Sequence, residues 1–315
     1  MRTYCFGIDV GGTTVKCGLF RTDGTLVEKW EIPTRKENNG DQILPDVAAA
    51  VNAKMEEKGI SKEDVEGVGI GVPGPVNSKG EVACAVNLYW GYKNVVGEME
   101  ELTGLHAEAG NDANVAALGE AWKGAAAGSS DVIMVTLGTG VGGGVILEGK
   151  ILTGHNGAAG EIGHMHVEDG EELNCNCGGC GCLEQYASAT GIVRVAQRTL
   201  AATEEETVLR KFTKLSAKNV LDAFKEGDKV ACDVMAQVGE MLGGTLAMFA
   251  CVTDPEAIVI GGGVSKAGQP LIDCIQKYYK KYAFSACKET PIILANLGND
   301  AGIYGSARMV IKEAQ

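Results

Sequence analysis

The sequence predicts an α/β protein built from two similarly folded halves. The chain has 315 residues, which is enough for two domains of about 150 residues each. Apolar strand-like runs alternate along it with helical patterns. The segment Gly11–Phe20, a glycine turn followed by a strand, also aligns without a gap with Gly138–Leu147. A repeated pattern of this kind indicates an internal duplication.

The first half is predicted from its apolar runs and its turns. An apolar run typical of a buried strand precedes the glycine turn Gly11-Gly12-Thr13-Thr14. Asp23-Gly24 is a hairpin signal between two further strand-like segments, and Pro73-Gly74-Pro75 ends a later one. The predicted elements are strands over 4–10, 15–20, 26–32 and 65–72, and helices over about 43–57 and 113–122.

The second half opens in the same way. A strand over 131–137 leads into a glycine turn over 138–143 and a strand over 144–147, which Glu148-Gly149 closes. Later, a strand over 257–260 precedes the run Gly261-Gly262-Gly263. Apolar residues at helical spacing predict the remaining elements. These are helices over about 183–201, 216–226, 229–252, 270–283 and 302–313.

Composition narrows the classes of function. Hydrophobic residues make up 45% of the chain and charged residues 22%, as in ordinary globular proteins. The 45 glycines, with only 7 prolines, indicate ordered tight turns. Since 28 basic and 41 acidic residues leave a net charge of −13, the surface repels nucleic acids and anionic membranes. We therefore expect neither nucleic acid nor a membrane as a partner.

No targeting or membrane-spanning segment is expected. Asp9 follows Arg2 too soon for the apolar region of a signal peptide. The longest uncharged run, 132–147, has 16 residues and is rich in glycine, so it does not predict a membrane-spanning helix. These observations predict a cytoplasmic protein, in which the 11 cysteines are not a disulfide framework.

A cluster of cysteines predicts a metal site. The chain carries His164 and, eleven residues later, the start of a glycine-rich loop with four cysteines: Cys175, Cys177, Cys180 and Cys182. Thiolates with one imidazole are the ligands of a closed tetrahedral zinc site, which is structural rather than catalytic. The alternative is a group of free thiols. Spacing alone does not select three of the four cysteines, nor does it choose between His164 and His166, which we expect on one face of a strand.

Three glycine turns that follow strands suit one polyanionic ligand. Glycine lets backbone N–H groups approach a phosphate closely, and hydroxyl groups at Thr13, Thr14 and Thr139 would add donors. The alternative is that the glycines only close hairpins.

Two common nucleotide motifs are excluded. Gly138, Gly140 and Gly143 match the dinucleotide fingerprint, but a strand follows them where the fingerprint requires a helix. The chain contains no P-loop motif.

Several carboxylates are candidates for catalysis or binding. Asn111 and Asp112 precede an alanine-rich helix, so one of them caps it, or Asp112 is a general base for a substrate hydroxyl that Asn111 orients. Asp9 would hold a magnesium ion through water, or it is an ordinary aspartate at a strand end. Glu161 and Glu184 flank the metal loop, where they would accept hydrogen bonds from sugar hydroxyls or remain exposed glutamates without such a role.

Over essentially its whole length the chain resembles the ROK family of sugar kinases and repressors, and most closely its bacterial ATP-dependent glucokinases. The glutamate–histidine motif followed by the cysteine motif is the most specific part of the resemblance. The segments that carry it are Asp9-x-Gly11-Gly12-Thr13, Gly110-Asn111-Asp112-Ala113-Asn114, Leu137–Gly143, Gly160–His164, Cys175–Glu184 and Gly261-Gly262-Gly263.

The resemblance implies an actin-like, ribonuclease-H-like ATPase fold of two α/β domains, with the active site in the cleft between them. It implies an N-terminal domain over 1–113, with a C-terminal helix at 302–315 packed on it, and a second domain over 114–301 that carries the zinc loop.

The resemblance also implies the site residues. The zinc ligands would be His164, Cys175, Cys177 and Cys182, which leaves Cys180 as an extra thiol, and Asp112 would be the base. The implied sugar contacts are Asn87, Asn111, Asp112, Glu161, His164 and Glu184. The implied contacts of ATP and magnesium are Asp9, Gly11, Gly12, Thr13, Thr14, Lys16, Gly138, Thr139, Gly140, Gly262 and Gly263.

The implied activity is transfer of the γ-phosphate of ATP to the 6-hydroxyl of glucose by a homodimer or homotetramer, with Mg²⁺ and a structural Zn²⁺. The alternatives are a kinase for fructose, mannose, N-acetylmannosamine, N-acetylglucosamine or allose, polyphosphate as the phosphoryl donor, and a sugar sensor without activity. A repressor of this family carries a helix-turn-helix segment ahead of the kinase-like part, and with Asp9 so near the start of the sequence we do not expect a repressor.

Overall fold

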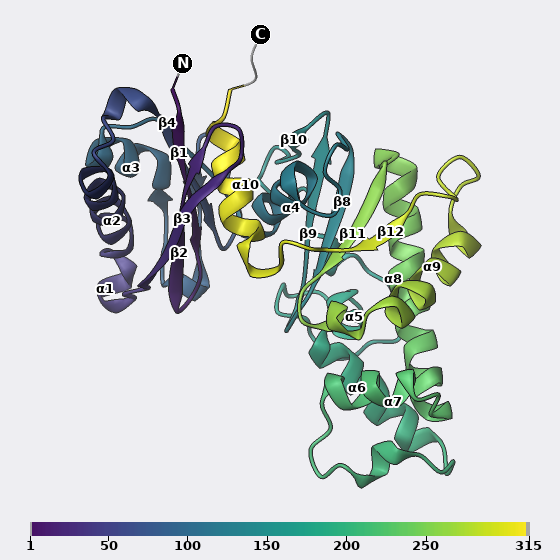
Figure 1. Cartoon of the computed structure of the whole chain (residues 1–315). Coiled ribbons are helices and arrows are strands. Elements are labelled where there is room, and N and C mark those ends of the chain that lie inside the picture. The colour runs from purple at the N-terminus through teal and green to yellow at the C-terminus, as the bar shows by residue number, and fades with distance from the viewer. Residues whose placement is uncertain (1, 313–315) are drawn as a thin grey trace. The chain divides into compact units, whose positions relative to one another are not determined.

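The computed structural model describes residues 2–312, which fall into two compact units (Figure 1). The first unit contains the chain up to Ser130, then Gly144–Gly160, and then the chain from Asn296; the second contains Asp131–Gly143 and Glu161–Ala295. The expected boundary at residue 113 does not coincide with these units. Helix α4 (Asp112–Lys123) belongs to the first unit because it packs along α10 (Ala301–Val310).

The first unit is a five-stranded sheet with helices on both faces. The strand order is β3-β2-β1-β4-β7, in which β1, β4 and β7 are parallel and the β3-β2-β1 neighbours are antiparallel. The strands are β1 (Tyr4–Val10), β2 (Thr14–Arg21), β3 (Leu26–Pro33), β4 (Val65–Val72) and β7 (Ala107–Asn111), with a small ladder of β5 (Glu81–Val82) and β6 (Lys93–Asn94). Besides α4 and α10, the helices are α1 (Glu37–Gly40), α2 (Ile43–Lys58) and α3 (Val95–Thr103).

The faces of this sheet follow from the alternation of its side chains. Phe6 and Ile8 of β1 join the apolar core beneath α2, whereas Cys5 faces the opposite side and packs with α10. Helix α10 approaches the sheet closely because glycines stand beneath it. A Cβ atom at Gly7 would lie 1.9 Å from the carbonyl oxygen of Ile303, so only glycine fits there.

The second sheet has the same plan as the first. Its order is β10-β9-β8-β11-β12, with β8, β11 and β12 parallel, so the two sheets correspond strand for strand. The predicted duplication is therefore present in the fold. The strands are β8 (Val132–Leu137), β9 (Val141–Leu147), β10 (Lys150–Ile151), β11 (Ala257–Gly261) and β12 (Ile292–Leu294), and the division between the units falls within β9.

The second unit adds five helices to its strands. They are α5 (Glu184–Ala187), α6 (Ala189–Ala202), α7 (Ala217–Lys225), α8 (Lys229–Thr253) and α9 (Gln269–Tyr282). Helix α8 is the one helix of the described chain whose length and composition would suit a membrane span, with a mean hydropathy of 1.3. However, 56% of this apolar window is buried, and Val234, Leu242 and Leu246 are inaccessible in the core. We therefore regard α8 as a core helix.

Several predicted bounds differ from the structure. The second glycine turn is shorter than expected, because β9 begins at Val141 rather than at Gly144. The helix expected over 183–201 is broken at Ser188, whose extended backbone and hydroxyl cap a new helix by accepting the N–H of Gly191 at 3.0 Å. Helix α10 ends at Val310, and residues 313–315 of the expected terminal helix lie outside the described residues.

Candidate active site and metal centre

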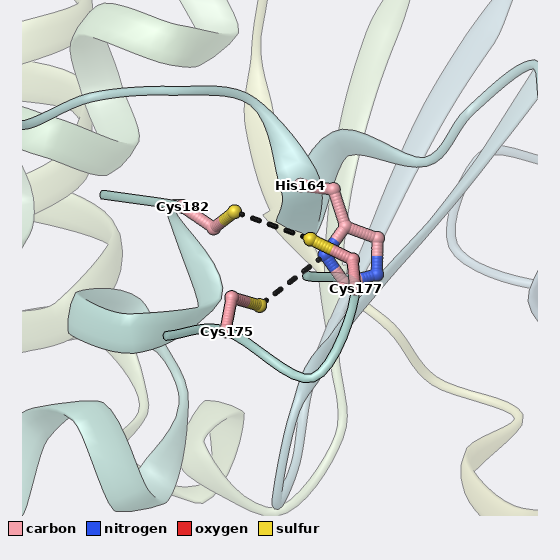
Figure 2. Close-up of side chains that lie close together, drawn as sticks. All are labelled: His164, Cys175, Cys177 and Cys182. Carbon is pink, nitrogen blue, oxygen red and sulfur yellow. Dashed lines mark hydrogen bonds between the residues drawn. The ribbon is translucent and has the colours of Figure 1, made fainter. Parts of the chain in front are cut away.

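Four side chains of the second unit form a compact group of metal-ligand type (Figure 2). One ligand atom from each of His164, Cys175, Cys177 and Cys182 lies within 4.8 Å of all the others. The Nδ1 atom of His164 is 3.7 Å from Sγ of Cys175, and Sγ of Cys177 is 3.6 Å from Sγ of Cys182. In a tetrahedral site with Zn–S bonds of about 2.3 Å, neighbouring sulfurs lie about 3.8 Å apart. The donor set and its spacing therefore fit Zn²⁺.

The local fold selects these four ligands from the six candidates. His164 ends a 3-10 turn (Ile162–His164), so the predicted strand with both histidines on one face is wrong. His166 points elsewhere, with Nδ1 2.9 Å from the carbonyl oxygen of Cys180 and Nε2 2.8 Å from Asp169. The thiol of Cys180 donates to Oδ1 of Asn174 at 3.2 Å, outside the group.

The thiols of the group lie in different environments. Burial, together with the neighbouring thiols, raises the pKa of Cys182 to about 12, whereas a hydrogen bond from the backbone of Gly179 lowers the pKa of the exposed Cys177. A metal ion binds thiolates, so it has to displace the proton of Cys182. Metal binding at this site is therefore expected to release protons and to weaken in acid.

The expected sugar-binding residues of the second unit lie around this metal group. His164 directs Nδ1 toward the sulfurs, while its Nε2 lies 3.9 Å from Oε2 of Glu161. Glu184, the first residue of α5, accepts the N–H of Val141 at 2.9 Å, and its other oxygen is 4.0 Å from Sγ of Cys175. The structure thus brings Glu161, His164 and Glu184 together with the second glycine turn.

The two glycine turns of the second unit lie at the carboxyl ends of neighbouring strands. The turn Gly138–Gly140 follows β8, and Gly261–Gly263 follows β11; a Cβ at Gly262 would lie 2.5 Å from the carbonyl oxygen of Leu137. The turn Gly138–Gly140 is held by α6, because the hydroxyl of Thr190 donates to the carbonyl oxygen of Thr139 at 2.8 Å. Sequence reasoning missed Thr190; its signal is the Ser188-x-Thr190 cap immediately after the cysteine motif.

The first glycine turn lies in the first unit, between β1 and β2. Asp9 stands at its start with Oδ2 3.8 Å from Nζ of Lys16, which also donates to the carbonyl oxygen of Asn299 at 2.9 Å. Burial raises the pKa of the Asp9 carboxyl above its ordinary value, and Lys16 opposes that shift. A Cβ at Gly12 would lie 3.8 Å from the carbonyl oxygen of Asn87, so the structure places Asn87 beside the turn. The backbone N–H groups at Thr13 and Thr14 belong to the same hairpin.

Of the two residues that the sequence offered as a helix cap, the structure shows Asn111 as the cap and Asp112 as the first residue of α4. Asn111 ends β7 and is the cap, since its Oδ1 accepts the N–H groups of Ala113 and Asn114 at 3.0 and 3.2 Å. Its Nδ2 donates to the carbonyl oxygen of Gly74 at 3.1 Å, which fixes the amide. Asp112 accepts the N–H of Ala113 at 2.9 Å but remains exposed at the start of α4. Its carboxylate is therefore oriented by the helix and accessible from outside.

Two corresponding α/β sheets, with glycine turns at the ends of their strands, define the actin-like class of ATPase folds. The family model described as "ROK family" matches residues 5–313, and the chain belongs to this family.

Individual relatives match along nearly the whole chain. A glucokinase of Halalkalibacterium halodurans is 42% identical, over 96% of this chain and 94% of that protein. An N-acetyl-D-glucosamine kinase of Vibrio atlanticus is 31% identical, over 98% of this chain and 99% of that protein. A crystal structure of a ROK family glucokinase from Streptomyces griseus, in complex with glucose and AMPPNP, is 35% identical with a TM-score of 0.74, covering 97% of this chain and 98% of that one.

Proposed function

We propose that the protein is an ATP-dependent glucokinase that transfers the γ-phosphate to the 6-hydroxyl of glucose. The relatives named glucokinase, and the related structure with glucose and AMPPNP, support this substrate pair. The observation that carries the proposal is the arrangement at the start of α4. Because Asn111 caps the helix, the carboxylate of Asp112 is left oriented and exposed, as a general base requires.

In the proposed reaction Asp112 takes the proton of the sugar hydroxyl as it attacks the γ-phosphorus, and the bond to the β-phosphate oxygen of ATP breaks. In this proposal the sugar hydroxyls donate hydrogen bonds to the carboxylates of Glu161 and Glu184 and also bond to the side chains of Asn87, Asn111 and His164. The phosphates of ATP are held by backbone N–H groups of the three glycine turns. Asp9 would hold Mg²⁺, and the cation would neutralise charge on the phosphates.

Zinc has a structural part in this proposal. The ligands would be His164, Cys175, Cys177 and Cys182, and a closed site of four protein ligands leaves no position for substrate. Binding of zinc to Nδ1 would fix the imidazole of His164, with its Nε2 directed away from the sulfurs and beside Glu161. We also propose that the two units correspond to the two domains of the family, a cytoplasmic location, and assembly as a homodimer or homotetramer.

The first test is ADP production from Mg-ATP with a panel of hexoses and N-acetylhexosamines. Glucose should lead by kcat/KM. If N-acetyl-D-glucosamine leads, the activity is that of the Vibrio relative and the substrate assignment is wrong, although the kinase assignment stands.

The second test addresses the base. Asp112→Asn should reduce kcat by at least about 10²-fold, the usual contribution of a general base, with glucose affinity by calorimetry largely unchanged. Asp233→Asn, an exposed aspartate on α8, is the matched control and should have wild-type kcat. Near-normal turnover of Asp112→Asn would remove Asp112 as the base.

A further inference from the structure

One carboxylate outside the proposed catalytic residues is buried in the metal loop, by which we mean residues 168–182 with the three cysteine ligands. The side chain of Glu171 is 1% exposed and accepts four hydrogen bonds. Two come from the guanidinium of Arg198, both at 2.9 Å, one from the hydroxyl of Tyr186 at 2.7 Å, and one from the N–H of Leu173 at 3.0 Å. The bidentate Arg198 lowers the pKa of Glu171 to about 2, so this carboxylate is charged at neutral pH.

These contacts fasten the loop to two helices. Glu171 lies four residues before Cys175, whereas Tyr186 belongs to α5 and Arg198 to α6. The other flank of the loop is tied to the same short helix by Gln185. Its Nε2 donates to the carbonyl oxygen of Leu173 at 2.8 Å, and its Oε1 accepts the N–H of Cys182 at 3.0 Å.

The rest of the loop is held by backbone hydrogen bonds at its end, where Val167 donates to the carbonyl oxygen of Gly181 at 2.7 Å, and by few buried side chains. Apart from Glu171 and the two buried ligands Cys175 and Cys182, most of its described side chains are exposed, and even Leu173 is 51% exposed. A loop without an apolar core of its own depends on specific polar contacts for its position. Glu171 is buried whereas the side chain of Arg198 is 48% exposed, and the bidentate geometry of the pair, with two parallel N–H···O bonds, fixes the position of the carboxylate.

We propose that Glu171, Arg198 and Tyr186 form a clasp that positions the metal loop independently of the metal, and with it Glu184 at the start of α5. Glu171 is then a positioning residue for sugar binding, which rests on the proposed function. Metal and clasp hold the same loop from two sides, and each partly compensates for the loss of the other in keeping Glu184 beside the glycine turn.

The test uses Glu171→Gln in the zinc-loaded, full-length protein. The variant should raise KM for glucose about tenfold while KM for ATP and kcat stay within about twofold, and it should release zinc to a chelator about tenfold faster, as expected when a partner that supports a metal site is lost. Asp222→Asn, which breaks an exposed ion pair with Lys218 on α7, is the matched control and should change none of these values.

A second comparison separates positioning from simple stability. Glucose affinity is measured by calorimetry with and without zinc, in the wild type and in Glu171→Gln. Because each fastening partly compensates for the loss of the other, loss of both should weaken binding by more than the product of the two single losses. If the two effects multiply, or if zinc release and glucose KM are unchanged in a folded variant with a lowered Tm, the clasp is only structural and the proposal is wrong.

If Glu171→Gln does not fold, the same measurements are made on Tyr186→Phe and Arg198→Lys. Each keeps part of the clasp and should show the same changes at smaller size; wild-type zinc release in both would overturn the proposal. Zinc release is measured without sugar, so a wild-type protein inactive on every sugar would refute the proposed function while the clasp is still judged on the metal.

Discussion

Two adjacent glycines after β11 should respond in opposite ways to the same added methyl group. Gly262 has a φ of +84°, and a Cβ there would lie 2.5 Å from the carbonyl oxygen of Leu137 and 2.7 Å from its backbone N and C atoms. Gly263 has a helical backbone (φ −66°, ψ −33°), and within the described residues a Cβ built on it would meet no atom within 4 Å apart from those of its neighbours along the chain. Gly262 is thus required by the packing of β11 against β8, and Gly263 is not.

The size of the effect at Gly262 follows from two terms. An alanine in the left-handed region costs about 1–2 kcal/mol. The clash is with backbone, which cannot rotate away, so the end of β8 has to move, and overpacking of this kind adds about 1–3 kcal/mol. We expect Gly262→Ala to lose about 3 kcal/mol, or roughly 6–12 °C in Tm at about 2–4 °C per kcal/mol. Gly263→Ala should be neutral or stabilised by about 0.5 kcal/mol, because its φ and ψ suit alanine.

The substitution at Gly263, which should leave stability intact, should instead weaken the binding of ATP. If its N–H binds a phosphate of ATP, a methyl group keeps that phosphate away and removes one hydrogen bond to a charged group. That bond is worth about 1.5 kcal/mol, or about tenfold in KM for ATP, with glucose affinity unchanged. Thermal unfolding and ATP kinetics on the two variants are sufficient to check both expectations. An unchanged Tm for Gly262→Ala would refute the packing, and an unchanged KM for Gly263→Ala would refute the role in phosphate binding.

Three further outcomes are expected. Cys177→Ser should lose zinc and weaken glucose binding, measured by metal analysis and calorimetry; retention of both would contradict a structural metal. Glu120→Ala should lose about 3 kcal/mol or more in urea unfolding, because the inaccessible Glu120 accepts the N–H groups of Ala125, Asn296 and Leu297 at 2.7, 3.2 and 2.8 Å and would leave them unpaired. Glu171 has a folded-state pKa lowered from 4.5 to about 2, so the stability that it contributes is present above pH 4.5 and is lost as the pH falls toward 2. The difference in unfolding free energy between wild type and Glu171→Gln should therefore be up to about 3 kcal/mol at pH 6 and smaller at pH 3. A difference that stays constant with pH would contradict the ion pair.

The sequence was sufficient for features that depend on neighbouring residues. The duplicated hairpins were predicted because each is a strand, a glycine turn and a strand in immediate succession, and the match of the two sheets confirms them. The short parallel strands β7 and β12 and helix α3 were not predicted. Their segments are brief, and they become strands and a helix through pairing with β4 and β11 and packing against β7.

The site was predictable only where a residue type itself limits the chemistry. Three thiols and a histidine indicate a metal wherever they meet, but Glu171 stands in the acidic run Glu168-Asp169-Gly170-Glu171-Glu172, and nothing local marks it as the buried one. Its partner Arg198 comes 27 residues later on α6. The unit boundary had the same difficulty: α4 joins the first unit because a Cβ at Gly119 would lie only 2.3 Å from the carbonyl oxygen of Ala301, a contact between segments far apart in the chain.

The two sheets share one plan, yet their equivalent strand ends have diverged chemically. In the second unit β11 ends at Gly261 and runs into Gly262 and Gly263; under the proposed function the backbone N–H groups of this turn bind phosphate, so that an acidic protein of net charge −13 holds ATP without a cluster of cations. In the first unit the equivalent strand β4 is followed by Pro73, which has no N–H, and by Gly74, whose carbonyl oxygen fixes the amide of Asn111 beside Asp112. The same position thus presents donors in one copy and an acceptor in the other. Under the proposed function this is the difference between holding the phosphates of ATP and placing the base that receives the proton of the sugar.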